Sequence, residues 1–404
     1  MGENESRAMV EVKASPLPQP AEKPEGYFAV TARRYRNVFR VLLITLVLFA
    51  VLFVLFFSKA FTYDSLYYFV RDISGIAATL GTDCDEISYA YHEGDFAVAM
   101  YRGGIVRIST AGVEIFRPDG EHALRAEIGF TAPRLAQSRR YVIAYDFGGS
   151  DFYVFNAYDE LYHGTTDAPI LGITVSDSGE FAILVPSGRS LSAVLYYNTD
   201  FTLIQRFERG FATTDMAISE NGEKIAFLGI GSDGDVLEVY EIGSAEPTAT
   251  VPLSVGTADS VMFLSSKNIA AVGFGGVAVL QTDGKILKNI SYSGRRLLSV
   301  RKSEDGFAVA FCEKDTNNGA EISVFDKWGE ERYQVRDSGE FRDMTLFGKN
   351  LFVLSENRLQ AFSAKGEALG IADCKEGADR VLAASATRAA AAGESLAVFY
   401  TFGN

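Results

Sequence analysis

The side chains best suited to chemistry are few in this sequence and lie far apart. Histidine occurs three times, at His92, His122 and His163. A zinc site needs three or four convergent ligands, and these histidines fall in different units of the chain, where surface or strand-edge positions explain them. The HExxH, GxSxG and P-loop motifs are absent. We therefore predict no catalytic residue, no metal site and no cofactor.

Two short acidic loops have oxygen-bearing side chains at nearly alternate positions, a pattern that suits calcium. The first loop carries Asp233, Asp235 and Glu238, and the second carries Asp315, Asn317 and Glu321. Neither matches the full EF-hand loop, and both lie between strand-like runs. A solvated hairpin is the simpler interpretation, so we predict no calcium site in either loop.

An apolar run at residues 41–57 stands apart from the rest of the chain. It has no charged residue, and Thr45 is its one polar member. As a helix it is ~25 Å long, and its neighbours extend it towards the ~30 Å of a bilayer core. We predict a single transmembrane signal-anchor helix at residues 38–60. A cleaved signal peptide and a buried core helix are the weaker alternatives, because a long charged region precedes the run and no polar stripe divides it.

Basic residues precede this run, at Arg33, Arg34, Arg36 and Arg40. Such an excess predicts an N-terminus in the cytoplasm and a C-terminal domain outside the cytoplasmic membrane. Residues 1–37 are Pro-rich and predict a disordered cytoplasmic tail. The chain has a net charge of −14; residues 1–40 carry seven Lys/Arg and five Glu, which leaves −16 for the remainder. That charge repels polyanions and excludes nucleic acid as a partner.

Beyond residue 85 the chain repeats. Residues 175–185 (VSDSGEFAILV), 218–228 (ISENGEKIAFL) and 302–311 (KSEDGFAVAF) share Ser, an acidic residue, Gly and then an apolar strand. Weaker copies bring the number of turns to eight, near 94, 139, 179, 222, 268, 306, 349 and 388, with a mean spacing of 42. After each turn come further short strands divided by Gly. Four strands in ~42 residues is the size of a β-propeller blade.

The repeat predicts an all-β fold, a β-propeller of eight four-stranded blades at residues 86–404, with seven blades as the alternative. The last blade, from Asp379, has room for three strands. Residues 61–85 are predicted to form a stalk, in which residues 73–82 supply the missing fourth strand. Since the two ends of a closed ring meet, a Cys84–Cys374 bridge is conceivable. Cys84, Cys312 and Cys374 are an odd number without CxxC spacing, and buried free thiols are favoured.

The SxDGxxxAF and GxVxVxDxxGK patterns of these repeats resemble the blades of WD40-like, TolB-like and PQQ-like β-propellers. The layout, with its apolar run, is similar to membrane-anchored propeller proteins of unknown function from Firmicutes. The Trp-Asp dipeptide of WD40 blades is absent, and Trp328 is the sole tryptophan. The resemblance therefore implies a fold, without the tryptophan-docking pattern of quinone-dependent enzymes or their cofactor.

These features predict a non-catalytic, membrane-tethered scaffold that binds an envelope protein or a cell-wall partner. The rival prediction is a cell-surface enzyme acting on glycan or peptidoglycan through carboxylates at the propeller axis. Carboxylates clustered in a central pocket would favour the enzyme. Aromatic pairs such as Tyr196 with Tyr197 and Tyr67 with Tyr68 could bind sugar or peptide, although strand packing or a membrane interface is the default for them.

Overall fold

The computed structural model describes residue 35 and residues 38–49, 84–313 and 319–403. The chain divides into two units, residues 1–81 and 82–404. Residue 35 and residues 38–49 are helical, and within this helix the Thr45 hydroxyl donates a hydrogen bond to the carbonyl of Val41 at 2.9 Å.

The predicted membrane topology is wrong on this structure. The twelve residues 38–49 give a helix of ~18 Å, against ~30 Å for a bilayer core. Among the described residues, no helix has the length and apolar character needed to cross a membrane. The prediction of a single-pass anchor with the C-terminal domain outside is therefore corrected. Residues 50–60 of the predicted span and residues 61–83 of the predicted stalk lie outside the described residues, as does nearly all of the predicted tail.

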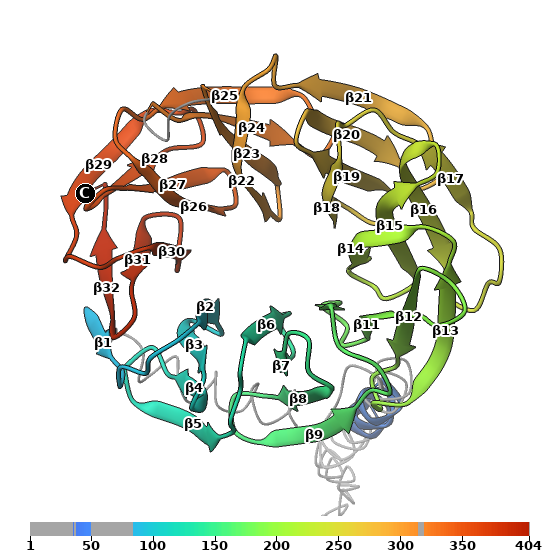
Figure 1. Cartoon of the computed structure of the whole chain (residues 1–404). Helices are drawn as coiled ribbons and strands as arrows, with labels where there is room; N and C mark the ends of the chain where they lie inside the picture. Colours follow the sequence, from blue (N-terminus) through green and yellow to red (C-terminus); the bar gives the residue numbers. More distant parts are fainter. Residues whose placement is uncertain (1–34, 36–37, 50–83, 314–318, 404) are drawn as a thin grey trace, which may run out of the picture. The chain divides into compact units, whose positions relative to one another are not determined.

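The second unit is a closed ring of eight four-stranded antiparallel sheets (Figure 1), which confirms the predicted eight-bladed propeller. Blades 1 to 7 each run from an inner strand to an outer strand in chain order. Blade 1 holds β2 (Phe96–Tyr101), β3 (Gly104–Ser109), β4 (Gly112–Phe116) and β5 (His122–Glu127). Blade 2 holds β6 (Pro133–Gln137), β7 (Val142–Asp146), β8 (Asp151–Phe155) and β9 (Glu160–Thr165). Blade 3 holds β10 (Gly172–Val175), β11 (Phe181–Pro186), β12 (Ser192–Tyr197) and β13 (Leu203–Arg209).

The remaining blades follow the same plan. Blade 4 holds β14 (Ala212–Ile218), β15 (Lys224–Gly231), β16 (Gly234–Glu241) and β17 (Ala249–Pro252), and blade 5 holds β18 (Ala258–Phe263), β19 (Asn268–Gly273), β20 (Gly276–Gln281) and β21 (Ile286–Ser291). Blade 6 holds β22 (Arg296–Ser303), β23 (Gly306–Cys312), β24 (Glu321–Asp326) and β25 (Glu331–Arg336). Blade 7 holds β26 (Phe341–Phe347), β27 (Asn350–Ser355), β28 (Arg358–Phe362) and β29 (Ala368–Asp373), and blade 8 holds β30 (Arg380–Ala383), β31 (Arg388–Ala392), β32 (Leu396–Thr401) and, at its outer edge, β1 (Glu86–Ser88).

The core lies between neighbouring blades. The two middle strands of a blade are buried on both faces, as in β11 and β12, because each face packs against another sheet. Leu184 and Tyr196 of blade 3, for example, pack with Met216 and Phe227 of blade 4. Outer strands such as β25 alternate between buried and exposed residues, since one of their faces meets solvent. The run of β-branched and aromatic residues in the middle strands suits this double burial.

Seven of the eight predicted turns join the first and second strands of a blade, as expected. The turn near residue 94 instead lies between β1 and β2, because β1 belongs to blade 8. The corresponding turn of blade 1 is Arg102–Gly103, where both residues have positive φ, 51° and 80°. Two successive positive φ values fit a type I′ hairpin, whose twist matches that of the strands. The predicted number of eight blades is therefore confirmed, although the turn near residue 94 was assigned to the wrong pair of strands.

The ring closes through β1, which pairs antiparallel with β32 and sets Ile87 opposite Ala397. The predicted donor was residues 73–82, which lie outside the described residues; Glu86–Ser88 occupies the place beside β32. A short strand suffices there because only Ile87, 1% exposed, turns inward. The Tyr89 hydroxyl adds a bond to the carbonyl of Gly393 just beyond the strand.

Shortening Ile87 should loosen this closure measurably. We expect Ile87→Val to lower the free energy of unfolding by about 0.5–1.5 kcal/mol, because one buried methylene is lost between blades 8 and 1. Denaturant titration of the full chain measures this change in the free energy of unfolding. Ser88→Ala, at the exposed neighbouring position, is the control and should change stability by less than about 0.5 kcal/mol. Equal effects of the two substitutions would mean that β1 does not bear on closure.

Candidate functional site

The structure does not bring the three histidines together. His122 lies on β5, with Nε2 3.3 Å from Glu114 Oε1, and His163 lies on β9, with Nε2 3.2 Å from Asp151 Oδ1. Both strands are outer strands, and His92 lies in the link between β1 and β2. Within the described parts of the chain, no group of three or more His, Cys, Asp or Glu side chains could hold a metal ion.

The two acidic loops are engaged in other contacts. The Asp235 carboxylate accepts the backbone N–H groups of Thr257 at 3.1 Å and Ala258 at 2.9 Å, and so braces the first residues of blade 5. Glu238 forms an ion pair with Arg209. In the second loop, Asp315 and Asn317 lie outside the described residues. Glu321, the remaining member, binds Arg295 at 2.8 Å and Arg336 at 3.3 Å.

The cysteines and the described tyrosine pair are structural. Cys84, Cys312 and Cys374 are free thiols, so the conceivable Cys84–Cys374 bridge is not formed. Burial raises the thiol pKa of both Cys84 and Cys374, which makes them poor nucleophiles. Tyr196 and Tyr197 are buried on β12, and the Tyr196 hydroxyl donates to the carbonyl of Gly222 at 2.7 Å. Tyr67 and Tyr68 lie outside the described residues.

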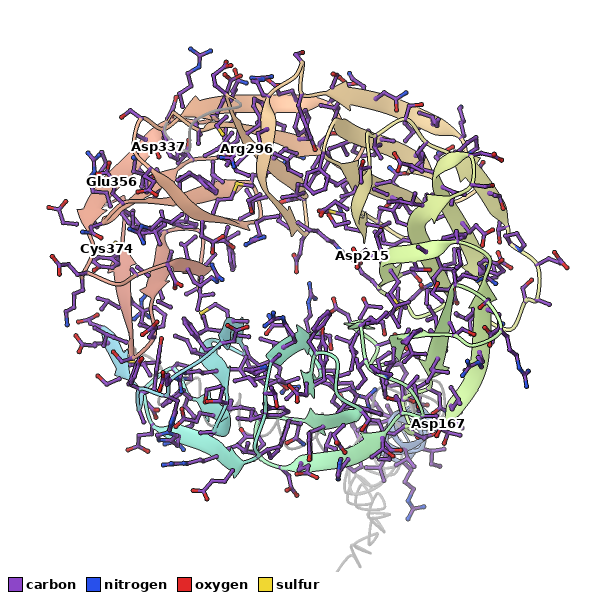
Figure 2. All side chains as sticks on the ribbon, in the orientation of Figure 1. Asp167, Asp215, Arg296, Asp337, Glu356 and Cys374 are labelled. Atoms are coloured by element: carbon purple, nitrogen blue, oxygen red, sulfur yellow. The ribbon has the colours of Figure 1, made fainter. Side chains whose placement is uncertain are left out.

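Two carboxyl groups near the inner edge of the ring have raised pKa values. Asp215 lies on inner strand β14, where Figure 2 shows it at the inner edge of the ring. Burial raises the pKa of its carboxyl from 3.8 to about 6, against the N–H bonds from Val261 and Met216, while Asp259 adds to the rise. Asp379 precedes β30, and burial raises its pKa as well. Blades 4 and 8 stand on opposite sides of the ring, so these two carboxyl groups do not form a catalytic pair.

Asp215 braces one blade against the next. Its Oδ2 accepts the N–H of Val261 on β18, the inner strand of blade 5, at 2.8 Å. Asp343 on β26 repeats the arrangement and accepts the N–H of Val381 on β30 at 3.0 Å. Both aspartates directly follow a β-bulge, which turns the side chain towards the following blade. Asp343 also binds Arg301 at 2.7 Å, whereas Asp215 has no ion pair within the described chain.

One face of the ring carries the turns between first and second strands and between third and fourth strands; we name it the turn face. Ion pairs connect several of its turns. Arg139 of blade 2 pairs with Asp177 of blade 3 at 3.5 Å and with Glu304 of blade 6. Lys302 of blade 6 pairs with Glu220 of blade 4 at 3.5 Å. Since blades 2 and 6 are four blades apart in a ring of eight, the pair with Glu304 reaches across the axis at this face.

The opposite face carries the links between blades and the loops between second and third strands; we name it the linker face. Backbone hydrogen bonds join its links and loops, for example Gly148 N–H to the carbonyl of Ile170 at 2.8 Å and Gly275 N–H to Val255 at 2.8 Å. Large apolar side chains are exposed on this face from the blade 8–blade 1 link to blade 5. They are Tyr91, Phe147, Leu171, Leu191, Ile230 and Phe274.

Elsewhere on the described propeller, exposed large apolar side chains are fewer or more dispersed. Four lie on outer strands, namely Leu203, Ile204, Ile286 and Ile371, and two lie at the turn face, namely Trp328 in a turn and Phe347 at the end of β26. The apolar set on the linker face was not visible in the sequence, because its members are single residues in separate links and loops or, for Ile230, at the end of a strand. The alternation of strands across each blade gathers them on one side.

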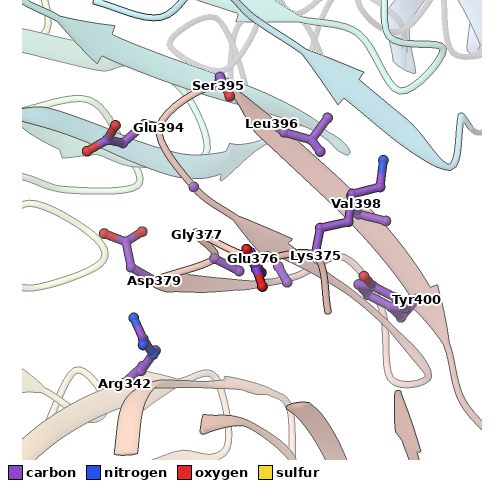
Figure 3. Close-up of a pocket in the computed structure, with 13 residues that line it drawn as sticks. Arg342, Lys375, Glu376, Gly377, Asp379, Glu394, Ser395, Leu396, Val398 and Tyr400 are labelled. Atoms are coloured by element: carbon purple, nitrogen blue, oxygen red, sulfur yellow. The ribbon is translucent and has the colours of Figure 1, made fainter. Parts of the chain in front are cut away.

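The linker face also contains a cavity of about 430 Å³ at blade 8 (Figure 3). Its lining comes from the link between β29 and β30, the loop between β31 and β32, β32 itself and the start of β26. Charged residues at its edge include Arg342, Lys375, Asp379 and Glu394. A second hollow of about 610 Å³ lies next to it and shares Asp379 and Glu394. We name the cavity of about 430 Å³ the seam cavity.

A closed ring of eight four-stranded blades, with a linker face that exposes apolar side chains, defines an eight-bladed β-propeller. Solved structures agree on the fold. Saccharomyces cerevisiae Sqt1 is 13% identical with a TM-score of 0.57, covering 80% of this chain and 100% of its own. BamB from Moraxella catarrhalis is 15% identical with a TM-score of 0.53, covering 78% and 97%. The C-terminal WD40 domain of Sif2 is 14% identical with a TM-score of 0.52, covering 73% and 89%.

The chain belongs to the DUF5711 family, a family of unknown function whose model matches residues 86–386. That match begins at β1 and runs into the turn before β31, so it covers the propeller except for β31 and β32. Among curated protein sequences, none matches the chain. At these identities the solved structures establish the fold and leave function to the residues of this chain.

Proposed function

We propose that this protein is a non-catalytic binding scaffold whose linker face docks a protein partner. The single observation that carries the proposal is the set of six large apolar side chains exposed on that face. Such side chains cost free energy in water, and covering each one on binding recovers about 25 cal/mol for every Å² of apolar surface. Exposed apolar groups that gather on one face, with polar groups around them, are typical of protein interaction sites.

The distribution of charge supports a protein partner further. The chain carries a net charge of −14, which attracts a partner with basic residues around an apolar centre and speeds their encounter. The carboxyl groups with raised pKa, Asp215 and Asp379, stand on blades 4 and 8, which does not match the paired carboxylates of a glycan-acting enzyme. Asp215 is also occupied by its bond to Val261. These observations favour binding over catalysis.

Substitution on the linker face tests the proposal. The full chain, its Phe147→Ser/Phe274→Ser variant and a Trp328→Ser/Ile371→Ser control are each used for affinity purification after crosslinking in cells. The control replaces apolar residues that are as exposed but lie on the turn face and an outer strand. We expect one stoichiometric partner with the native chain and the control, and its loss with the linker-face variant.

Titration of each variant with the purified partner then measures how much affinity each pair of substitutions removes. We expect the Kd to rise at least tenfold for Phe147→Ser/Phe274→Ser and less than about twofold for Trp328→Ser/Ile371→Ser, because interface cores dominate affinity. Recovery of the partner with both variants would place the docking surface elsewhere. Failure to recover any stoichiometric partner with the native chain would remove the scaffold proposal.

A further inference from the structure

The seam cavity has an apolar wall built by one strand. Leu396, Val398 and Tyr400 are alternate residues of β32 and therefore face the same side of the sheet. The residues between them, Ala397 and Phe399, face the opposite side and pack towards blade 1. Figure 3 shows the three wall residues following one another along β32, on one side of the pocket.

Blade 8 has an unusually small second strand, and one residue of that strand lines the cavity. β31 reads RAAAA, whereas the second strand of every other blade contains Ile, Leu or Phe. Ala391 lines the cavity and belongs to the core cluster between blades 7 and 8. A methyl group there leaves more space than the larger Val353 leaves at the corresponding position of β27.

The charged edge of the cavity has groups without counterparts. Among the residues that the structure describes, neither the Arg342 guanidinium nor the Glu394 carboxylate forms an ion pair, and Oδ1 of Asp379 is buried without a hydrogen-bond partner. Lys375, by contrast, is paired with Glu86 at 2.5 Å. Figure 3 shows Arg342 at one end of the edge, with Asp379 between it and Glu394.

Electrostatics at Asp379 indicate that a positive group would be stabilised beside it. Burial raises the pKa of its carboxyl, Asp343 and Glu394 raise it further, and Arg380 opposes them. Arg342 lies at the opposite end of the edge from Glu394, with Asp379 between them, and carries a positive charge there (Figure 3). The edge is therefore negative at Asp379 and Glu394 and positive at Arg342, while Lys375 and Glu376 also line the cavity.

We propose that the seam cavity binds an apolar α-amino acid as a zwitterion. The ammonium group lies beside Asp379 and Glu394, the carboxylate lies at Arg342, where a guanidinium suits it, and the aliphatic side chain packs against Leu396 and Val398. A volume of about 430 Å³ is within the range of small-molecule sites and accommodates such a ligand. The cavity lies on the same linker face as the proposed docking surface, but the binding of this ligand does not depend on a protein partner.

Calorimetric titration of the full chain with L-leucine tests the proposal. We expect saturable binding, with at least a tenfold weaker Kd in Asp379→Asn and in Arg342→Gln. Arg125→Gln, which removes an exposed guanidinium from β5 in blade 1, is the matched control and should bind as the native chain does. Ala391→Val narrows the cavity without touching its charges and should also weaken binding. Each variant is first shown to melt as the native chain does.

Two blocked analogues of leucine distinguish binding of a free amino acid from binding of the end of a peptide chain. N-acetyl-leucine keeps the carboxylate without the ammonium group, and leucinamide keeps the ammonium group without the carboxylate. We expect both to bind at least tenfold more weakly than leucine. Binding of one analogue as tight as that of leucine would overturn the zwitterion in favour of a peptide terminus. Absence of leucine binding, or binding unchanged in Asp379→Asn and Arg342→Gln, would overturn the proposal itself.

Discussion

Arg107→Ala is expected to lower the free energy of unfolding by about 3–5 kcal/mol. Arg107 lies on β3 and is 1% exposed, so its charge is held inside the protein. Its Nη1 is 3.1 Å from Glu114 Oε2, and its Nη2 donates to the carbonyl of Glu394 at 3.3 Å. The guanidinium carbon also lies 4.7 Å from the ring centre of Tyr89. Alanine leaves the Glu114 carboxylate buried without its cation and removes a link between blade 1 and blade 8.

Chemical denaturation followed by circular dichroism measures this effect in the full chain. Arg125→Ala is the control, because Arg125 lies on the same blade, is 57% exposed and is 4.0 Å from Glu127. A pair so exposed contributes little, and we expect a change below about 0.5 kcal/mol. The double variant Arg107→Met/Glu114→Gln should recover most of the loss, since it removes both buried charges together. A loss in Arg107→Ala no larger than in Arg125→Ala would contradict the assignment of a buried ion pair.

Asp215→Asn is expected to stabilise the protein at pH 7 by about 1–3 kcal/mol. The folded pKa of Asp215, about 6, lies above the ordinary 3.8. Between these values the folded state holds a proton that the unfolded state releases, so stability falls as the pH rises from about 4 to about 6. Above pH 6 the whole penalty, about 3 kcal/mol for about two pKa units, is present. Asparagine stays neutral and still accepts the N–H of Val261.

The measurement is the difference in unfolding free energy between Asp215→Asn and the native chain from pH 4 to pH 8. We expect it to be near zero at pH 4 and to rise through pH 6. Asp343→Asn is the matched comparison, because Asp343 braces the inner strands of blades 7 and 8 in the same way but binds Arg301. That variant should be less stable by about 1–2 kcal/mol. A difference for Asp215→Asn that does not change with pH would show that its carboxyl titrates normally.

Sequence reasoning recovered most of the fold and little of the site. Motifs such as residues 175–185 identify turns, because Ser, Asp and Gly favour a turn through local hydrogen bonds and local backbone conformation. The three histidines lie on separate elements of the ring, as their spacing along the sequence indicates. The seam cavity and the apolar set of the linker face were not anticipated. Their residues come from loops and strands that are distant in the sequence, and RAAAA in β31 was recognised only as a weak copy of the repeat.

By itself, the sequence determined the all-β class, the repeat of about 42 residues and the eight blades. These depend on alternation and turn chemistry, which are local interactions. Only the tertiary structure decided that β1 closes the ring, that Asp215 and Asp343 brace successive blades, and that Arg342, Asp379 and Glu394 meet at one cavity. Those features depend on contacts between distant parts of the chain, such as Tyr89 with Gly393. No local pattern encodes which of many similar side chains will meet when a ring of repeats closes.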